Sequence, residues 1–417
     1  MRSPHHHGMS TLFVVIALFF VTALAGAFAN RHLLTELRVA RLVGDDRRAQ
    51  VAAEQGLERA LTLMNGDSVD DECQATPSGH RSAMDRWIRP LDSGHLVSRR
   101  DAQDATVLLC DRGPTDDWRC RCAGDQAPVG RAAEATPSSS VRVALQPVPS
   151  QPGQLWLAAH GCAEASAGCA APAPTADAAQ GRGSQRRMQV ALLPALRQVP
   201  SAALVAGGAV DLGDGMAVVN TDAATGGVAL RSGGRLAGSD GALIGPNGAR
   251  SGEQVLSHDT ELAQLRPQEL LRRLVGMSLD AWTRHPALRV LRCEARCDAS
   301  SVAAVFNQGA RFVWVDGSLR VDREVQWGEP ERPLALLVGG DLDWSAPSRW
   351  RGALLVGGEA RLSGGTGQAR FDGGVVVGGG VRGDASVQIV HQAKLLRLLQ
   401  HQVGSFVRVP GSLGAAP

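Results

Sequence analysis

Met9-Ser-Thr-Leu-Phe-Val-Val-Ile-Ala-Leu-Phe-Phe-Val-Thr-Ala-Leu-Ala-Gly-Ala-Phe-Ala29 is an uncharged, strongly apolar stretch of 21 residues near the start of the chain. As an α-helix rising about 1.5 Å per residue it is roughly 32 Å long, which matches the hydrocarbon core of one bilayer. We therefore predict one membrane crossing over residues 9–29. No other stretch of the sequence is both long and apolar enough to predict a second crossing.

The helical pattern continues beyond this stretch. No proline occurs between His5 and Thr76, so the sequence predicts one helix from about Met9 to Met64, roughly 80 Å long. Its later apolar residues recur at helical spacing, with charged residues between them: Leu33, Leu37, Ala40, Val43, Ala53, Leu57, Ala60 and Leu61. A protein that is merely anchored in a membrane rarely needs such a rod.

The flanks of the apolar stretch allow three interpretations. A secretory signal would be cut after the small residues of Ala27-Phe28-Ala29, and a plain signal anchor would keep the span. In the third interpretation, residues 1–8 are a class III prepilin leader, a short hydrophilic segment that ends in Gly8 directly before the apolar residues. We favour the third because the helical pattern continues so far past the span.

The amino terminus resembles that of type IV pilins, and specifically the PilX-type minor pilins. The resemblance covers about sixty residues and rests on Gly8, on Thr22-Ala-Leu-Ala-Gly26 and on Ala52-Ala-Glu-Gln-Gly-Leu57. It implies that a prepilin peptidase cleaves after Gly8 and leaves an N-methylated Met9 as the first residue. His5–His7 would then leave with the leader and bind no metal. The mature helix would start in the membrane with Met9, Leu12 and Phe13 and leave it near Ala29.

Phe13 departs from the pattern of the major pilins, which carry a glutamate at this fifth mature position. In that family the carboxylate is thought to meet the amino terminus of a neighbouring subunit, an attraction that lipid strengthens. A subunit that begins a filament has no earlier neighbour. Phe13 therefore favours a tip or priming role over a place in the filament body.

Composition excludes several other classes of protein. The formal net charge is +2 with no basic runs, so we expect no nucleic-acid partner. Lys394 is the only lysine, which excludes a Walker A loop. The sequence has no Gly-x-Ser-x-Gly, His-Glu-x-x-His or Ser-x-x-Lys motif, and we expect neither enzymatic activity nor a cofactor. The 49 glycines and 4% aromatic residues indicate a β-rich body.

The cysteines all follow the membrane span, and their number is even. In an oxidising periplasm such cysteines form structural disulfides, and we expect the local pairs Cys162–Cys169 and Cys293–Cys297, while the pairing of the others stays open. Zinc binding is the alternative, but no Cys-x-x-Cys spacing occurs and only His160 lies close to another cysteine. The eight are Cys73, Cys110, Cys120, Cys122, Cys162, Cys169, Cys293 and Cys297.

Residues 65–198 are expected to form a disulfide-containing, pilin-like β head. Alternating or apolar segments predict strands at 141–146, 155–159 and 187–193, separated by loops rich in proline, glycine and alanine. We expect a small antiparallel sheet that packs on the second half of the long helix. Three tryptophans in this part are expected in its core: Trp87, Trp118 and Trp156.

Residues 199–417 carry a recurring pattern of aliphatic residues followed by two glycines. Three copies, Leu336-Leu-Val-Gly-Gly340, Leu354-Leu-Val-Gly-Gly358 and Val375-Val-Val-Gly-Gly379, begin 18 and 21 residues apart, and Ala203-Leu-Val-Ala-Gly-Gly208 is an earlier one. Such spacing predicts the stacked coils of a Gly-rich β-solenoid, with a twisted β-sandwich as the alternative. Amphipathic segments at 267–278 and 393–401 predict inserted helices. The expected fold class is thus α+β.

Two motifs in this region could be read as ligand sites. Gly378-Gly-Gly-Val-Arg-Gly383 matches the dinucleotide-binding pattern, but a further strand rather than a helix follows it, so we interpret these residues as turn glycines. Several aspartates recur near turns and could bind calcium, although solvated turn carboxylates are the simpler interpretation: Asp211, Asp214, Asp240 and Asp341.

The carboxy-terminal part is also similar to larger PilX-type pilus assembly proteins. The matching pieces are 267–278 followed by Trp282, Cys293-x3-Cys297, 328–334 and Val409-Pro-Gly-Ser412. The resemblance implies a minor pilin that starts in the inner membrane as a single-pass protein, faces the periplasm and later reaches the cell surface. Its implied partners are prepilin peptidase, the assembly platform, other minor and major pilins and a tip adhesin. The alternatives are a type II secretion pseudopilin and an exported or anchored β-helical carbohydrate-binding or carbohydrate-cleaving protein.

Overall fold

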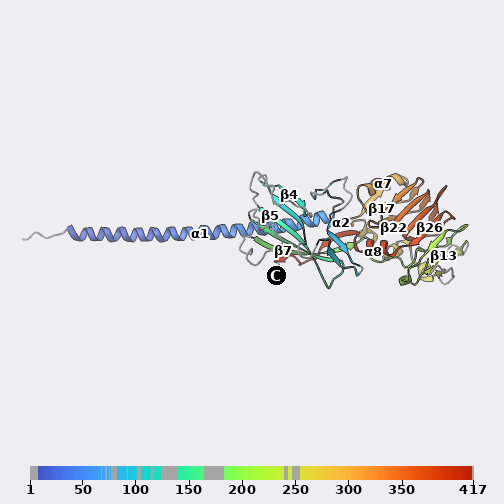
Figure 1. Ribbon diagram of the computed structural model, residues 1–417, viewed down its shortest axis with the longest axis horizontal. Helices are drawn as coiled ribbons and strands as arrows, with labels where there is room; N and C mark the ends of the chain where they lie inside the picture. The colour runs from blue at the N-terminus through green and yellow to red at the C-terminus, as the bar shows by residue number, and fades with distance from the viewer. Residues whose placement is uncertain are drawn as a thin grey trace, which may run out of the picture.

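The computed structural model describes residues 8–415 apart from 67, 71–72, 75, 77–81, 92, 101–104, 114–116, 124–138, 164–182, 239–242 and 247–253. Helix α1 (Gly8–Met64) is a single rod of 57 residues, about 86 Å long at 1.5 Å per residue. Figure 1 shows α1 projecting alone for most of its length, its last part inside a β-rich head, and a second β-rich part beyond the head. The chain therefore has an apolar amino-terminal helix followed by mostly β structure.

The last part of α1, from about Asp45, lies on an antiparallel sheet whose strands run in the order β27-β7-β6-β5-β3-β4. Several of the residues that α1 turns toward the sheet are small, and the backbones approach closely at these positions. A Cβ on Gly161 would lie 2.2 Å from the carbonyl oxygen of Ala49, and a Cβ on Gly56 would lie 2.5 Å from Val141. The alanines and glycine of 52–57 thus serve the packing of helix on sheet. The strands are β3 (Thr106–Arg112), β4 (Trp118–Cys122), β5 (Ser139–Pro147), β6 (Gln154–Cys162), β7 (Gly183–Pro194) and β27 (Gly404–Arg408).

The head has a continuous hydrophobic core between α1 and the inner face of this sheet. Leu57 and Met64 of α1 meet Leu108, Leu155 and Val190 of the strands there. Helix α2 (Ala83–Trp87) and the hairpin of β1 (Ile88–Pro90) and β2 (Leu96–Ser98) close the end of the head that faces the second β-rich part.

The predicted tryptophan core holds only in part. Trp87 is buried, whereas Trp118 is half-buried and donates its Nε1–H to Gln55 Oε1 at 2.9 Å. Trp156 lies on the outer face of β6, with the Arg187 guanidinium 4.6 Å from its ring centroid. The prediction is wrong for Trp156 because side chains alternate along a strand, and Leu155 and Leu157 take the inner face.

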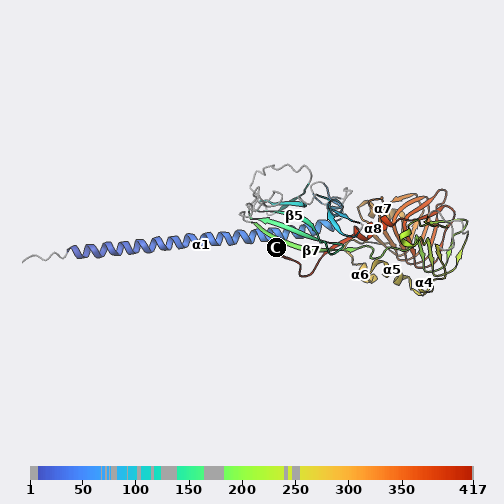
Figure 2. The same cartoon turned by 60° about the horizontal axis from the view of Figure 1, so that its bottom comes forward.

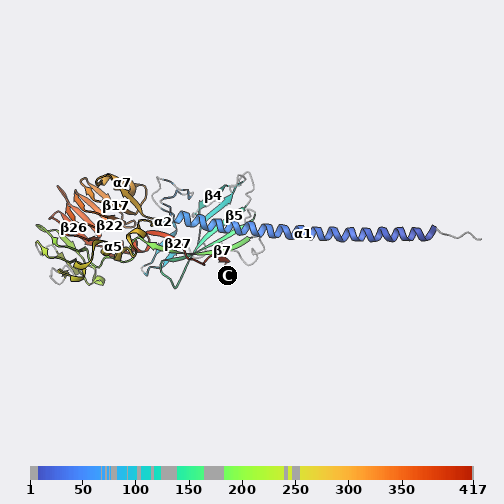
Figure 3. The ribbon, with the colours of Figure 1, turned by 180° about the vertical axis from the view of Figure 1, so that it is seen from behind.

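The domain boundary at 199–417 also needs correction. After the second β-rich part the chain returns to the head, where β27 pairs antiparallel with β7 and β28 (Gly414–Ala415) pairs further along the same strand. Figure 3 shows β27 beside β7 where the head meets the far part. Phe406 of β27 belongs to the core of the head. Residues 404–415 therefore belong to the head, because Phe406 is buried in its core and the backbones of β27 and β28 pair with β7.

The far part, hereafter the repeat region, is built from strands that pair in parallel. The strands form three columns, and the long strands β22 and β24 belong to two of them. The first column is β15 (Arg289–Arg292), β17 (Phe312–Asp316), β20 (Leu334–Val338), β22 (Ser348–Val356), β24 (Ala369–Val377), β8 (Leu204–Ala206), β11 (Leu230–Ser232) and β14 (Val255–Leu256). The second is β16 (Cys297–Asp298), β18 (Leu319–Val321), β21 (Leu342–Ser345), β23 (Ala360–Ser363), β25 (Val381–Arg382), β9 (Val210–Asp211) and β12 (Leu236–Ala237). The third is β19 (Val325–Trp327), the first halves of β22 and β24, β26 (Val387–His391), β10 (Ala217–Val219) and β13 (Leu243–Ile244).

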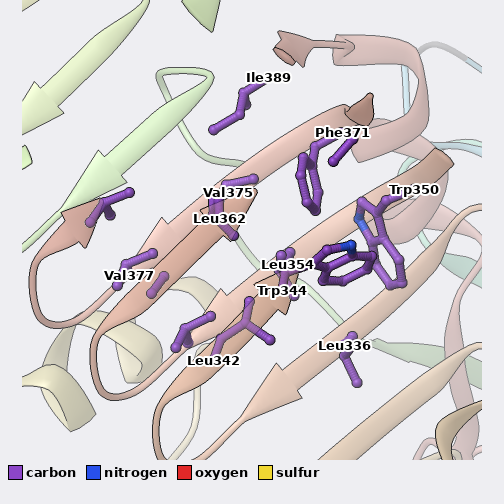
Figure 4. Packing of buried hydrophobic residues seen from close by; sticks show 14 of the residues in the cluster. Leu336, Leu342, Trp344, Trp350, Leu354, Leu362, Phe371, Val375, Val377 and Ile389 are labelled. Atoms are coloured by element: carbon purple, nitrogen blue, oxygen red, sulfur yellow. The ribbon is translucent and has the colours of Figure 1, made fainter. Parts of the chain in front are cut away.

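The repeated aliphatic motif occupies equivalent positions in the first column. Leu336 pairs with Leu354, Leu354 with Val375, and Val375 with Leu204. These residues face an interior that also holds Trp344, Trp350 and Phe371, as Figure 4 shows. The next residue of each copy faces the opposite side and packs under helices. Burial on both faces explains why the motifs are uninterrupted apolar sequences.

The order of the strands in space differs from their order in the chain. The chain enters the repeat region in its middle at β8, runs to one end at β14, and crosses to the opposite end at β15. It then returns to finish at β24, β25 and β26, which pair with β8, β9 and β10. We call this non-sequential junction the seam. A Cβ on Gly207 would lie 2.3 Å from the carbonyl oxygen of Gly378, so the turns at the seam require glycine.

Helices cover one face of the first column. Helices α4 (Thr260–Gln264), α5 (Pro267–Val275) and α6 (Leu279–Trp282) make the crossing from β14 to β15, and Figure 2 shows them along one side of the strands. Helix α7 (Ala299–Asn307) lies between β16 and β17, and α8 (Ala393–His401) leads back to the head. The apolar residues of α4, α5, α6 and α8 form one core with the outward residues of the first column, among them Leu271, Leu396, Leu337 and Leu355. The apolar residues of α7 pack instead with the interior core.

Candidate assembly surface

Residues of the expected processing site begin helix α1. Gly8 is the first helical residue and Met9 the second, while 1–7, the rest of the expected leader, lie outside the described residues. Leu12, Phe13 and Ala29 are exposed, Phe13 by 77%. Among the described residues, α1 is the one helix long and apolar enough to cross a membrane, and none of its most apolar window is buried.

The apolar surface of α1 continues past the 21-residue span. Six large apolar residues between the span and the head are 51–62% exposed: Leu33, Leu34, Leu37, Val39, Leu42 and Val43. The head covers α1 only from about Asp45 onward. A row of leucines and valines therefore lies outside the span and outside the head.

One side of this segment has the residue spacing at which two helices pack against each other. Leu33, Leu37, Ala40 and Gly44 are separated by four, three and four residues, and Val51 follows seven residues later. At 100° per residue these positions lie opposite the face that carries the buried alanines of the head core. We call this row the stripe. A Cβ on Gly44 would meet nothing within 4 Å, so a second helix has room to approach.

Polar contacts fix the last part of α1 to the head. Glu54 accepts a hydrogen bond from Gln50 at 3.1 Å, and its carboxylate lies 3.6 Å from the guanidinium of Arg186 in β7. Glu58 lies 3.8 Å from Arg408 of β27. These contacts leave the stripe itself uncovered.

The cysteines form disulfides rather than a metal site. Cys73–Cys122 ties the segment after α1 to β4 with a Cα–Cα distance of 4.9 Å, and Cys110–Cys120 joins β3 to β4. The Cys293–Cys297 disulfide connects the residue after β15 to the first residue of β16. Cys162 is also disulfide-bonded, and Cys169, its expected partner, lies outside the described residues. No group of three metal-ligating side chains occurs in the described part of the chain.

The other candidate ligand residues lie in turns and ion pairs. Gly378–Gly383 spans the turn before β25 and the strand itself, and β26 follows, so no helix opens at its glycines. Asp211 lies 3.6 Å from Arg382, and Asp341 accepts a hydrogen bond from the Glu359 amide. Asp214 is exposed, and Asp240 lies outside the described residues.

The joint between the head and the repeat region contains buried ionisable groups that sequence reasoning missed. Asp85 of α2 and Arg311, which precedes β17, are ion-paired at 2.7 Å and are almost fully buried. Gln402 donates to the same carboxylate at 3.1 Å, as does Ser82. Since these partners lie as far as 317 positions apart, no local pattern could indicate their contact.

Two buried histidines lie near the segments that connect the head to the repeat region. His285 accepts from the Ala287 amide at Nδ1 and donates from Nε2 to the Leu193 carbonyl oxygen at 3.1 Å. His391 contacts the Pro200 carbonyl oxygen with Nε2 at 3.4 Å. Burial lowers the pKa of both imidazoles below the ordinary value of 6.5, so the neutral form is favoured.

Comparison with solved structures gives a distant likeness to a pilin. No protein-family model matches the chain, and no curated protein matches it. The crystal structure of the competence-associated pilin ComZ from Thermus thermophilus is similar over 89% of this chain and 97% of that one, with 10% sequence identity and a TM-score of 0.22. A TM-score this low carries no argument about fold or function.

Proposed function

We propose that this chain is a minor pilin-like structural subunit of a type IV pilus, of the PilX type and without enzymatic activity. It would be made as a single-pass inner-membrane prepilin, cut after Gly8 by prepilin peptidase, and taken into a filament through α1. The soluble parts would face the periplasm and then the cell surface. The proposed partners are the assembly platform, other minor and major pilins and a tip adhesin.

The observation that carries this proposal is the exposed apolar surface of α1 outside the membrane span. An anchor needs only about 20 apolar residues, yet large apolar residues from Leu33 to Val43 continue the apolar surface beyond the 21-residue span, where the head does not cover it. Exposed apolar surface of this extent indicates a protein partner. A bundle of similar helices from other subunits would cover it.

The stripe supports a helix as that partner. Its spacing of four and three residues is that of left-handed helix packing, and its small members Ala40 and Gly44 permit a close approach. Gly26, inside the span, has the same open surroundings. Small residues are enriched where helices associate in lipid.

Phe13 supports a position at the tip or at the start of the filament. Its exposed aromatic ring offers no charge to a neighbouring amino terminus, unlike the glutamate of the major pilins. The same feature suits a pseudopilin of a type II secretion system, which we retain as the second candidate. The genes beside this one would separate the two, since minor-pilin genes cluster with one another.

We further propose that the repeat region is a β-solenoid that the filament displays. The parallel columns and the in-register aliphatic motifs support this assignment over a β-sandwich, whose strands are mostly antiparallel. In Figure 1 this region lies at the opposite end of the molecule from the membrane span. A displayed region at that end would be the first to meet other subunits or surfaces.

Photo-cross-linking in the native host tests the proposal. A benzophenone amino acid replaces Leu37 in the stripe, and the matched control replaces Leu91, an exposed leucine in the head. We expect Leu37 to yield cross-links to other proteins with a pilin-type helix, at least tenfold above the Leu91 control and only in cells with prepilin peptidase. Cross-links to lipid alone, or equal yields in cells without the peptidase, would refute a filament role.

A further inference from the structure

Arg47 lies within the stripe. It follows Gly44 by three residues and precedes Val51 by four, so it fills the one gap in the stripe's spacing of four and three residues. Its side chain is exposed, whereas Ala49, on the opposite side of α1 at this level, is fully buried against the head. A helix that packs along the whole stripe therefore has to cover a positive charge as well as apolar residues.

The chain itself supplies Arg47 with no counterion in the part that the structure describes. Asp46 precedes it but lies about 100° around the helix, and adjacent residues of a helix do not face each other. Glu54, the next acidic residue toward the head on this side, accepts a hydrogen bond from Gln50 at 3.1 Å and lies 3.6 Å from the Arg186 guanidinium. The four residues one helical turn away on its side are uncharged: Val43, Gly44, Gln50 and Val51.

The membrane span limits which helix can cover Arg47. Two copies of this chain in one bilayer would hold their helices parallel and at the same depth, because both carry the same 21-residue span. Packed stripe against stripe, they would bring two Arg47 guanidinium groups together, and like charges repel more strongly where packing excludes water. A helix of another protein, with a carboxylate at this level, has the complementary charge.

We propose that the stripe docks the extended helix of a different single-pass membrane protein, and that an Asp or Glu of that helix pairs with Arg47. This inference rests on the filament-subunit function proposed above and names the chemistry of the partner. Arg47 is the eighteenth residue after Ala29, about 27 Å beyond the span. The partner's helix must therefore continue at least this far past its own span. The small residues Ala40 and Gly44 let its backbone come close, so that the carboxylate reaches the guanidinium and forms a charge-assisted hydrogen bond.

Cross-linking in the native host tests the charge of Arg47. The benzophenone amino acid again replaces Leu37, and the yield is normalised to the amount of chain in the membrane. We expect Arg47→Glu to lower the yield of protein cross-links at least tenfold, and Arg47→Lys to keep at least half of it. Arg38→Glu is the matched control, because this exposed residue is nine positions from Arg47 and therefore on the opposite side of the helix. If Arg47→Glu does not accumulate, Arg47→Gln replaces it, with a loss of at least threefold expected. An undiminished yield in the charge variant would overturn the proposal.

The identity of the cross-linked protein is the second readout. Mass spectrometry should show a different protein with an acidic residue near the cross-linked position, and replacing that acid with arginine should restore the yield of Arg47→Glu. Two differently tagged copies of the chain test the rival occupant: cross-links that join the two tags, and that increase when Arg47→Glu is mixed with the natural chain, would overturn the proposal.

The same experiment separates this inference from the proposed function. Cross-links that require prepilin peptidase but do not depend on Arg47 would refute this inference alone. Cross-links that depend on Arg47 but not on the peptidase would refute the filament role alone. Without any protein cross-link from Leu37, both would be refuted.

Discussion

Removing the charge of Asp85 should destabilise the protein more than removing any exposed carboxylate. In Asp85→Asn the side chain keeps its shape, but Arg311 stays buried with no counterion. Breaking a buried ion pair by removing one partner costs about 3–5 kcal/mol. The corresponding loss for Asp343→Asn, whose pair with Arg320 is partly exposed, is about 0–1 kcal/mol.

Urea unfolding of the full chain, followed by tryptophan fluorescence, measures both losses. Five of the eight tryptophans, among them Trp327, Trp344 and Trp350, lie in the repeat region, so the signal reports mainly the part that holds Arg311. A double variant, Asp85→Asn with Arg311→Met, should recover most of the loss, because it removes the unpaired charge. Stability of Asp85→Asn within 1 kcal/mol of the natural chain would refute this reasoning, as would a double variant no more stable than Asp85→Asn.

Three further predictions concern the head, the histidines and the seam. Gly161→Ala should cost about 1–3 kcal/mol, since its Cβ would overlap the backbone of α1 at Ala49, whereas Gly414→Ala, with open space around it, should be neutral in the same unfolding assay. The lowered pKa values of His285 and His391 mean that below about pH 6.5 the unfolded chain binds protons that the folded chain does not. The free energy of unfolding should therefore be highest above that pH and fall below it. In a His285→Gln variant it should fall less between pH 7.5 and 5.5 than in the natural chain, and an equally steep fall would contradict this reasoning. At the seam, an Asp211→Cys/Arg382→Cys pair should form a disulfide as readily as the control pair Arg320→Cys/Asp343→Cys, which joins strands that follow one another. After proteolysis in the crossing between β14 and β15, only the disulfide at the seam should hold the two fragments together on a non-reducing gel.

Local patterns predicted the elements that depend on local sequence. The absence of proline and the helical spacing placed the end of the long helix at Met64, where α1 ends. The three strands predicted in the head overlap β5, β6 and β7. The arrangement of an apolar helix before a β-rich body was thus visible in the sequence.

Features that depend on distant contacts were not visible. β27 joins the head because Phe406 fits its core, and nothing near Phe406 in the sequence indicates this. Val375 pairs on one side with Leu354, the preceding copy in the chain, and on the other side, across the seam, with Leu204. Leu204 in turn pairs with Leu230, the copy that follows it in the chain. Equivalent repeats make such alternatives indistinguishable by pattern, because every copy offers the same aliphatic residues and glycines. The contact of Asp85 with Arg311 is hidden for a similar reason, since each is an ordinary charged residue in its own segment.

The amino-terminal mass of the protein, purified from its native membrane with and without prepilin peptidase, tests the filament-subunit proposal most directly. We predict that the chain begins at a methylated Met9 when the peptidase is present and at Met1 when it is absent. A chain that begins at Asn30, or that keeps Met1 in both strains, would contradict the proposal and leave an exported protein with a β-rich repeat region.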